Sequence, residues 1–203
     1  MKKYSFIIFI FLLSCAPTEP VEMHDDNAVL HTLLNMGTGT IEIKDCSDFP
    51  DTVCVWEEAR ITLLNLFNMG LNGNIPDEIG DLTELKQLGL KSNNLSGELP
   101  ESIGKLTNLT QLNLADNALS GSIPDTIGNL ISLTNLVLSN NEFSGSIPNS
   151  IGELSILHTF LADSNNFSGT ISSDICTIYP NFIDYNLAGN KFCQSLPTCL
   201  DTP

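Results

Sequence analysis

A unit of about 24 residues is repeated along the middle of this 203-residue chain, from Ile61 to Asn181. Its consensus is L-x-x-L-x-L-x-x-N-x-L-x-G-x-I-P-x-x-I-G-x-L-x-x, and its clearest copies begin at Leu85, Leu109 and Leu133. A unit this short cannot enclose a hydrophobic core of its own, so successive units must stack and share one. The repeat therefore predicts an elongated solenoid whose function depends on the surface that stacking creates.

Each unit contains leucines that alternate with other residues, as in Leu64-Asn65-Leu66 and Leu88-Gly89-Leu90. This alternation is typical of a strand with one buried face. Stacking the units in register predicts a parallel β-sheet with strands about 4.8 Å apart. Five units carry an asparagine at one shared position, namely Asn93, Asn117, Asn141, Asn165 and Asn190. We expect these amides to satisfy backbone groups in the turns of their own and the neighbouring unit.

The ends of the solenoid need caps, because a terminal unit would otherwise expose its apolar cross-section. Residues 25–35 predict a short amphipathic helix in which Asp25, Asp26 and Asn27 supply capping groups. The predicted fold is an α/β repeat solenoid with a parallel sheet. Its parts are a signal peptide (1–14), a tether (15–24), an N-terminal cap with a helix and a cysteine pair (25–60), five full repeats (61–181), and a truncated sixth repeat with a C-terminal cap (182–203).

Cysteines cluster near both ends of the repeats, which suits an oxidising compartment. Cys46 and Cys54 flank a seven-residue gap before the repeats, and Cys193 and Cys199 flank a five-residue gap after the last full one. We expect each pair to form a disulfide that staples one end of the stack. Cys176 is then left over as a buried thiol. The main competing connectivity pairs Cys176 with Cys193 or Cys199, because sequence alone does not fix pairing.

The first residues predict export. Lys2 and Lys3 precede the apolar run 6–13, which has the size of a signal-peptide core and is too short to span a bilayer. The run ends at Leu12-Leu13-Ser14-Cys15, and a polar, proline-containing tether follows. This segment resembles a bacterial lipoprotein signal, which implies cleavage before Cys15 and diacylglycerol on its sulfur. An ordinary secretory signal with an incidental Cys15 is the alternative.

The chain is strongly acidic, with 24 Asp and Glu against 8 Lys and Arg and a net charge of −16. Removing residues 1–14 would remove Lys2 and Lys3 but no acid, and so would leave −18. Nucleic acid and anionic lipid surfaces are therefore poor partners, since both require clustered cations. A basic protein, a cation or a neutral glycan remains open, as does a simple role of the charge in solubility.

The segment L-x-G-x-I-P, seen in Leu119-Ser-Gly-Ser-Ile-Pro124, resembles the plant-type subclass of leucine-rich repeats. That subclass is found in receptor-kinase ectodomains and polygalacturonase-inhibiting proteins, and the resemblance covers about residues 46–200. It implies a curved right-handed superhelix with a parallel sheet on the concave side and an added second sheet. It also implies recognition of a protein or glycan, not catalysis. We expect no metal and no cofactor.

The outward-facing positions of the predicted strands line the concave face, which is mostly small and polar. The candidate ligand-binding residues are Phe67, Lys91, Asn113, Val137, Leu161 and Asp163. We expect Phe67 and Leu161 to act as apolar anchors for a protein or peptide, with Lys91 and Asp163 as polar contacts. Scattered apolar residues are also normal on a sheet that binds nothing.

The sequence offers no convincing enzyme site. Ser164, His158 and Asp163 can be assembled on paper into a nucleophilic set, but such residues are abundant on any polar sheet. No histidines or cysteines share metal-ligand spacing on one element. Three acids, Asp77, Glu101 and Asp125, share one offset after a proline, which predicts either a solvated turn or an edge that attracts Ca²⁺ or a basic partner.

The predicted function is therefore a non-enzymatic protein- or peptide-binding or adhesion module. The signal places it on a bacterial outer membrane or cell surface, where it would contact the membrane through the lipid on Cys15 alone. One alternative is a glycan binder or an inhibitor of a secreted polysaccharide-degrading enzyme. A second is a plant-like secreted or apoplastic leucine-rich-repeat protein.

Overall fold

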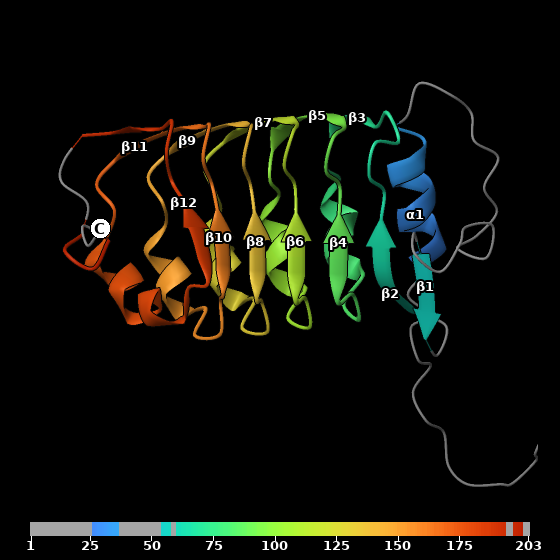
Figure 1. Ribbon diagram of the computed structural model, residues 1–203. Helices are drawn as coiled ribbons and strands as arrows, with labels where there is room; N and C mark the ends of the chain where they lie inside the picture. Colours follow the sequence, from blue (N-terminus) through green and yellow to red (C-terminus); the bar gives the residue numbers. More distant parts are fainter. Residues whose placement is uncertain (1–25, 37–53, 58–59, 194–196, 201–203) are drawn as a thin grey trace, which may run out of the picture.

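The computed structural model describes residues 26–36, 54–57, 60–193 and 197–200. Figure 1 shows the strands of one sheet side by side along one face of an elongated molecule, with a second row of strands along its upper edge. The helix α1 lies at one end of the stack, beside β1 and β2. The chain is a solenoid, as the repeat predicts.

The main sheet has seven strands within the described residues, in the order β1-β2-β4-β6-β8-β10-β12. Their bounds are β1 Cys54–Glu57, β2 Arg60–Asn65, β4 Gln87–Gly89, β6 Gln111–Asn113, β8 Asn135–Val137, β10 Thr159–Leu161 and β12 Asp184–Asn186. β1 runs antiparallel to β2, and every later pair is parallel. Leu88 pairs with Leu64 on one side and Leu112 on the other, which confirms the predicted stacking in register.

A second sheet of six parallel strands is formed within the described residues, in the order β13-β11-β9-β7-β5-β3. The bounds are β3 Asn72–Asn74, β5 Asn94–Glu98, β7 Ala118–Gly121, β9 Glu142–Gly145, β11 Asn166–Gly169 and β13 Lys191–Phe192. Short 3₁₀ helices complete the coils: η2 Asp77–Asp81, η3 Glu101–Lys105, η4 Asp125–Asn129, η5 Asn149–Glu153, η6 Ser173–Thr177 and η7 Tyr179–Asn181. The isoleucine of η2 to η6, such as Ile103, points into the core.

The asparagine column behaves as predicted. The Asn141 amide nitrogen donates to the carbonyl of Leu138 in its own unit at 3.1 Å and to that of Leu114 in the preceding unit at 3.0 Å. Its side-chain oxygen accepts the backbone N–H of Leu119 at 3.0 Å. Because one buried amide satisfies three backbone groups from two coils, it locks neighbouring units together.

The N-terminal helix α1 (Asp26–Leu34) lies within the predicted range, but Asp26 has another role than capping in solvent. Its side chain is buried, and both carboxylate oxygens lie 3.0 Å from Nε of Arg60. The backbone N–H of Ile61 donates to the same carboxylate at 2.7 Å. The helix is therefore fixed to the first repeat by an ion pair, and Leu30 and Leu33 complete the core beneath it.

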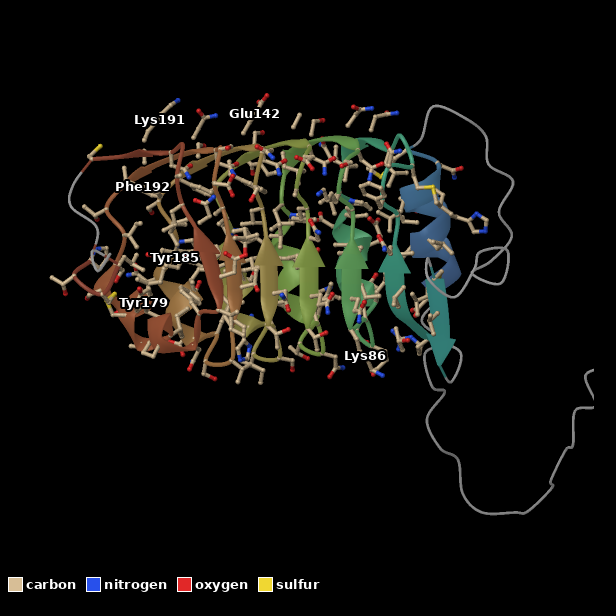
Figure 2. All side chains as sticks on the ribbon, in the orientation of Figure 1. Lys86, Glu142, Tyr179, Tyr185, Lys191 and Phe192 are labelled. Carbon is tan, nitrogen blue, oxygen red and sulfur yellow. A yellow bond between two sulfur atoms is a disulfide. The ribbon has the colours of Figure 1, made fainter. Side chains whose placement is uncertain are left out.

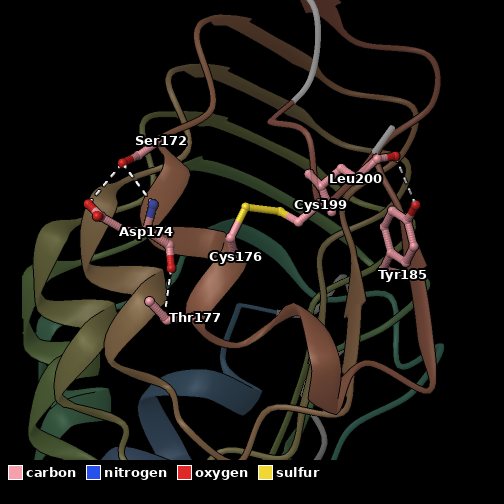
Figure 3. The surroundings of a disulfide bond; sticks show 7 residues. All are labelled: Ser172, Asp174, Cys176, Thr177, Tyr185, Cys199 and Leu200. Atoms are coloured by element: carbon pink, nitrogen blue, oxygen red, sulfur yellow. Dashed lines mark hydrogen bonds between the residues drawn. A yellow bond between two sulfur atoms is a disulfide. The ribbon is translucent and has the colours of Figure 1, made fainter. Parts of the chain in front are cut away.

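The disulfide pairing in the C-terminal cap differs from the predicted one. Cys176 and Cys199 form the disulfide (Figure 3). Cys193 is a free, exposed thiol. The prediction of a Cys193–Cys199 bridge and a buried Cys176 thiol is therefore wrong, and the competing Cys176–Cys199 pairing is correct. At the other end, Cys54 is disulfide-bonded, whereas Cys46, its predicted partner, lies outside the described residues.

The glycine column gives the physical reason for this pairing. A Cβ placed on Gly128 or Gly152 would point straight at the next coil, at 2.7 Å from Ser150 Cβ or 3.1 Å from Asp174 Cβ. Those contacts lie 22 residues further along. Cys176 occupies this column, and one extra residue in the last coil makes its facing position 199, so the bridge joins directly stacked positions 23 residues apart.

Aromatic rings close the core beyond β10. Tyr179, Phe182 and Tyr185 contact one another with ring centroids 5.5–6.1 Å apart, and Phe182 also meets Phe160 in the preceding coil. Figure 2 shows Tyr179 and Tyr185 at this end of the molecule. They cover apolar surface that a further coil would otherwise bury.

The predicted signal peptide and tether, with Cys15, lie outside the described residues. None of the helices in the described part of the chain has the length and apolarity to cross a membrane.

Candidate functional site

The concave face is formed by alternate residues of the main sheet. In β10, Phe160 is fully buried, whereas Thr159 and Leu161 on either side are partly exposed. The same pattern recurs in β4, β6 and β8. Stacking in register turns each outward position into a row that crosses all coils.

Three of the six candidate residues lie next to one another in one such row. Asn113 in β6 pairs with Val137 in β8, and Val137 pairs with Leu161 in β10. Adjacent strands are about 4.8 Å apart, so the side chains of Val137 and Leu161 form one continuous apolar platform. Both side chains are partly exposed.

Phe67 lies apart from this platform. It follows β2, its side chain is 54% exposed, and four strand spacings separate its coil from that of Leu161. At about 4.8 Å a strand this is about 19 Å. The two predicted anchors are therefore not brought together, and only an extended ligand could touch both.

Polar side chains between these points are organised around Asp116. Its carboxylate accepts the Asn140 amide at 2.8 Å and the Ser92 hydroxyl at 3.4 Å, and Nζ of Lys91 lies 3.5 Å away. The predicted polar contact Lys91 thus already lies beside an opposite charge. Both side chains are more than a third exposed, so the pair stabilises the fold little.

Asp163, the last candidate residue, has a different environment. Its carboxylate accepts the Ser139 hydroxyl at 2.6 Å and the Ser164 hydroxyl at 3.3 Å. No cation lies within ion-pair distance of it among the described residues. The two hydroxyls orient this carboxylate beside Leu161.

Asp116, Ser139 and Asn140 were not chosen as candidates from the sequence, although they carry the polar network. One pattern in the sequence points to part of this network. Three residues after the end of β2, β4, β6, β8 and β10, the chain adopts positive φ angles of 54–57°, at Asn68, Ser92, Asp116, Asn140 and Ser164. Short polar side chains are the ones that tolerate this left-handed conformation. Their recurrence at one offset therefore marks a row of turns along the rim.

The pattern of the repeats is matched by a known family model. The model described as a leucine-rich repeat region matches residues 44–177. The chain belongs to the leucine-rich repeat family. No curated protein matches it.

Solved leucine-rich-repeat structures share the fold. A chain of the BIR3–SERK2 complex from Arabidopsis thaliana has a TM-score of 0.69 and 31% identity, over 86% of this chain and 99% of that one. The PEPR1–AtPEP1 structure has a TM-score of 0.77 and 26% identity, over 87% of this chain. The Arabidopsis receptor kinase HAESA ectodomain, in complex with an IDA peptide hormone ligand, has a TM-score of 0.64 and 35% identity, over 67% of this chain. This leucine-rich-repeat chain spans only 26% of the PEPR1 chain and 22% of the HAESA chain.

The described leucine-rich-repeat sheet does not bring together the Ser164, His158 and Asp163 set. His158 precedes Asp163 by five residues of nearly extended chain, which places them about 16 Å apart, so the Ser/His/Asp set is not assembled. Within the described residues, no three His, Cys, Asp or Glu side chains converge to hold a metal ion. The acids Asp77, Glu101 and Asp125 are exposed on the first turns of η2, η3 and η4, away from the concave face.

Proposed function

We propose that this leucine-rich-repeat chain binds a protein or peptide on its concave sheet without catalysing a reaction, and that a lipid on Cys15 holds it on a bacterial envelope. The observation that carries the binding proposal is the apolar platform of Val137 and Leu161. It is set on a sheet in which neighbouring polar side chains such as Ser139 and Asn140 are held by hydrogen bonds between coils. Such a pre-formed surface loses little entropy when a ligand binds.

Two further points favour a protein or peptide over a glycan. The related HAESA ectodomain was solved with a peptide hormone ligand. In the described part of the concave rows, Phe67 is the sole aromatic side chain, and it stands about 19 Å from the platform. A sugar-binding surface of this kind would more typically offer several rings for stacking.

The envelope location rests on the sequence around Cys15 and on the Cys176–Cys199 disulfide, which suits an exported protein. Its test is mass spectrometry of the mature N-terminus, where we expect an acylated Cys15. A product that begins at another residue, or that carries an unmodified Cys15, would refute the anchor without affecting the binding proposal.

The binding proposal is tested by replacing Val137 and Leu161 together with serine. The chain, purified from cells that export its full-length sequence, is screened against a phage-displayed library of random 12-residue peptides and against a glycan array. We expect peptide binding that the double variant loses. A matched control is the change of Ile131 and Ile156 to serine, because these side chains are 63% and 44% exposed in the turns before β8 and β10. Equal losses in both variants, or binding to glycans alone, would refute the concave peptide site.

A further inference from the structure

We infer that the C-terminal half of the concave face selects a ligand with a basic side chain, whose aliphatic stem lies on Val137 and Leu161 and whose charged head reaches Asp163 or Asp184. This inference rests on the proposed peptide-binding function and specifies its ligand. It is carried by the arrangement of two carboxylates around one apolar platform.

The first step is geometric. Asp163 follows Leu161 by two residues on the same face, about 7 Å along the strand direction. Asp184 in β12 pairs with Thr159 in β10, which puts it diagonally across from Leu161 at about 7–8 Å. The carboxylates therefore flank the platform on two sides, at distances that the extended stem of a lysine or arginine spans.

The second step concerns charge. Asp163 is oriented by two hydroxyl groups, and Asp184 is exposed and makes no side-chain hydrogen bond or ion pair in the described structure. The N-terminal half of the face differs, because Lys91 lies 3.5 Å from Asp116 and offsets its charge. The described rows crossing β8, β10 and β12 contain acids but no lysine or arginine. A cationic group is thus attracted to this half, whereas an acidic ligand is repelled.

The third step joins the two kinds of surface. Lysine and arginine place an apolar stem on hydrophobic surface while the charged head stays hydrated at its edge. Val137 and Leu161 offer the apolar surface, and the two carboxylates offer acceptors at its edge. The net charge of −16 adds long-range attraction for a basic partner.

The test uses the full chain and the phage-displayed library of random 12-residue peptides. We expect selected peptides to share a Lys or Arg at one position, and Asp163→Asn or Asp184→Asn to weaken a synthesised peptide about tenfold. Replacing the shared basic residue with norleucine, which keeps the stem but removes the charge, should weaken binding by at least this factor. The same replacement should have no further effect on the double variant Asp163→Asn with Asp184→Asn, because both carboxylates are then gone.

Asp77→Asn and Asp125→Asn are matched controls, since they remove the same charge from exposed turns outside the concave face. Asp184→Asn should leave the fold intact, because the Asp184 carboxylate supports no contact within the described residues. A loss of binding in this variant is therefore not explained by misfolding. Peptides that bind through Val137 and Leu161 but carry no shared cation, or that respond equally to Asp77→Asn, would overturn this inference and leave the proposed function standing. A library that yields no peptide, or peptides insensitive to Val137 and Leu161, would overturn both.

Discussion

The ion pair between Asp26 and Arg60 is the contact whose loss has the largest predictable effect on the N-terminal cap. The Asp26 side chain is 1% exposed and that of Arg60 22%. Removing one partner of a buried pair costs about 3–5 kcal/mol, and a stranded buried N–H costs a further 1–3 kcal/mol. Arg60 keeps its hydrogen bonds to the Asp81 carbonyl at 2.9 Å and the Thr83 hydroxyl at 3.2 Å. We therefore expect a free-energy cost near the lower end of the summed range. We expect about 4 kcal/mol for Asp26→Ala.

Asp26→Asn should cost less, about 3 kcal/mol, because its amide oxygen still accepts the N–H of Ile61. In a solenoid each unit contacts only its neighbours, so the loss is local. Native-state hydrogen exchange is therefore the appropriate assay. For Asp26→Ala, the amides of Leu30 and Leu33 should lose about 10³-fold in protection, while those of β6 keep theirs.

Two results would refute this reasoning. One is a loss of protection in α1 smaller than tenfold. The other is an equal loss in α1 and β6, which would mean that the whole stack unfolds as a unit. A double variant, Asp26→Leu with Arg60→Leu, removes both charges and should be more stable than Asp26→Leu alone, because no buried charge is left unpaired.

Four further predictions concern the other end and the middle of the stack. Cys176→Ser should lower the free energy of unfolding by about 3 kcal/mol, measured in urea, since the bridge spans 23 residues. Iodoacetamide without reductant should label Cys193 and leave Cys176 unlabelled, as mass spectrometry of peptides would show; the reverse would contradict the pairing. Gly128→Ala should cost about 1–3 kcal/mol in thermal unfolding, because the added Cβ would lie 2.7 Å from Ser150, and an unchanged midpoint would contradict that contact. Burial raises the pKa of Tyr185 above 10.0, so its contribution to stability is complete below pH 10 and is lost as the pH rises through the raised pKa. Ultraviolet titration should show one tyrosine that ionises late, and Tyr185→Phe should remove that phase.

The features of the fold that could be predicted from the sequence are those that recur in every repeat. Leu64, Leu88 and Leu112 are in register, and the Asn141 amide spans two coils, because each requirement recurs at every unit. The parts that were missed occur once. No repeated pattern reveals that Asp26 pairs with Arg60, since the partners come from a cap and from the first coil, 34 residues apart.

Residue types along the strands select candidate positions on the concave face, but they do not determine how these positions are arranged in space. Val137 and Leu161 were chosen as apolar residues on a polar face, and the register places them side by side. Phe67 was chosen by the same rule, but counting strands between coils would already have separated it from Leu161. Hydrogen bonds such as Ser139 to Asp163 depend on rotamers and on the left-handed turns, which single residue types do not determine.

Because the register of the concave sheet is regular, distances along the solenoid are set in steps of one repeat unit. A duplicated unit inserted between β4 and β6 would contact the same asparagine amides, the same leucine column and the same glycines on both of its sides. It would move Phe67 about 4.8 Å further from Val137 and change the immediate surroundings of neither. Gain or loss of whole units could thus adjust the length of ligand the face accommodates in fixed steps, while the chemistry at each end stays the same.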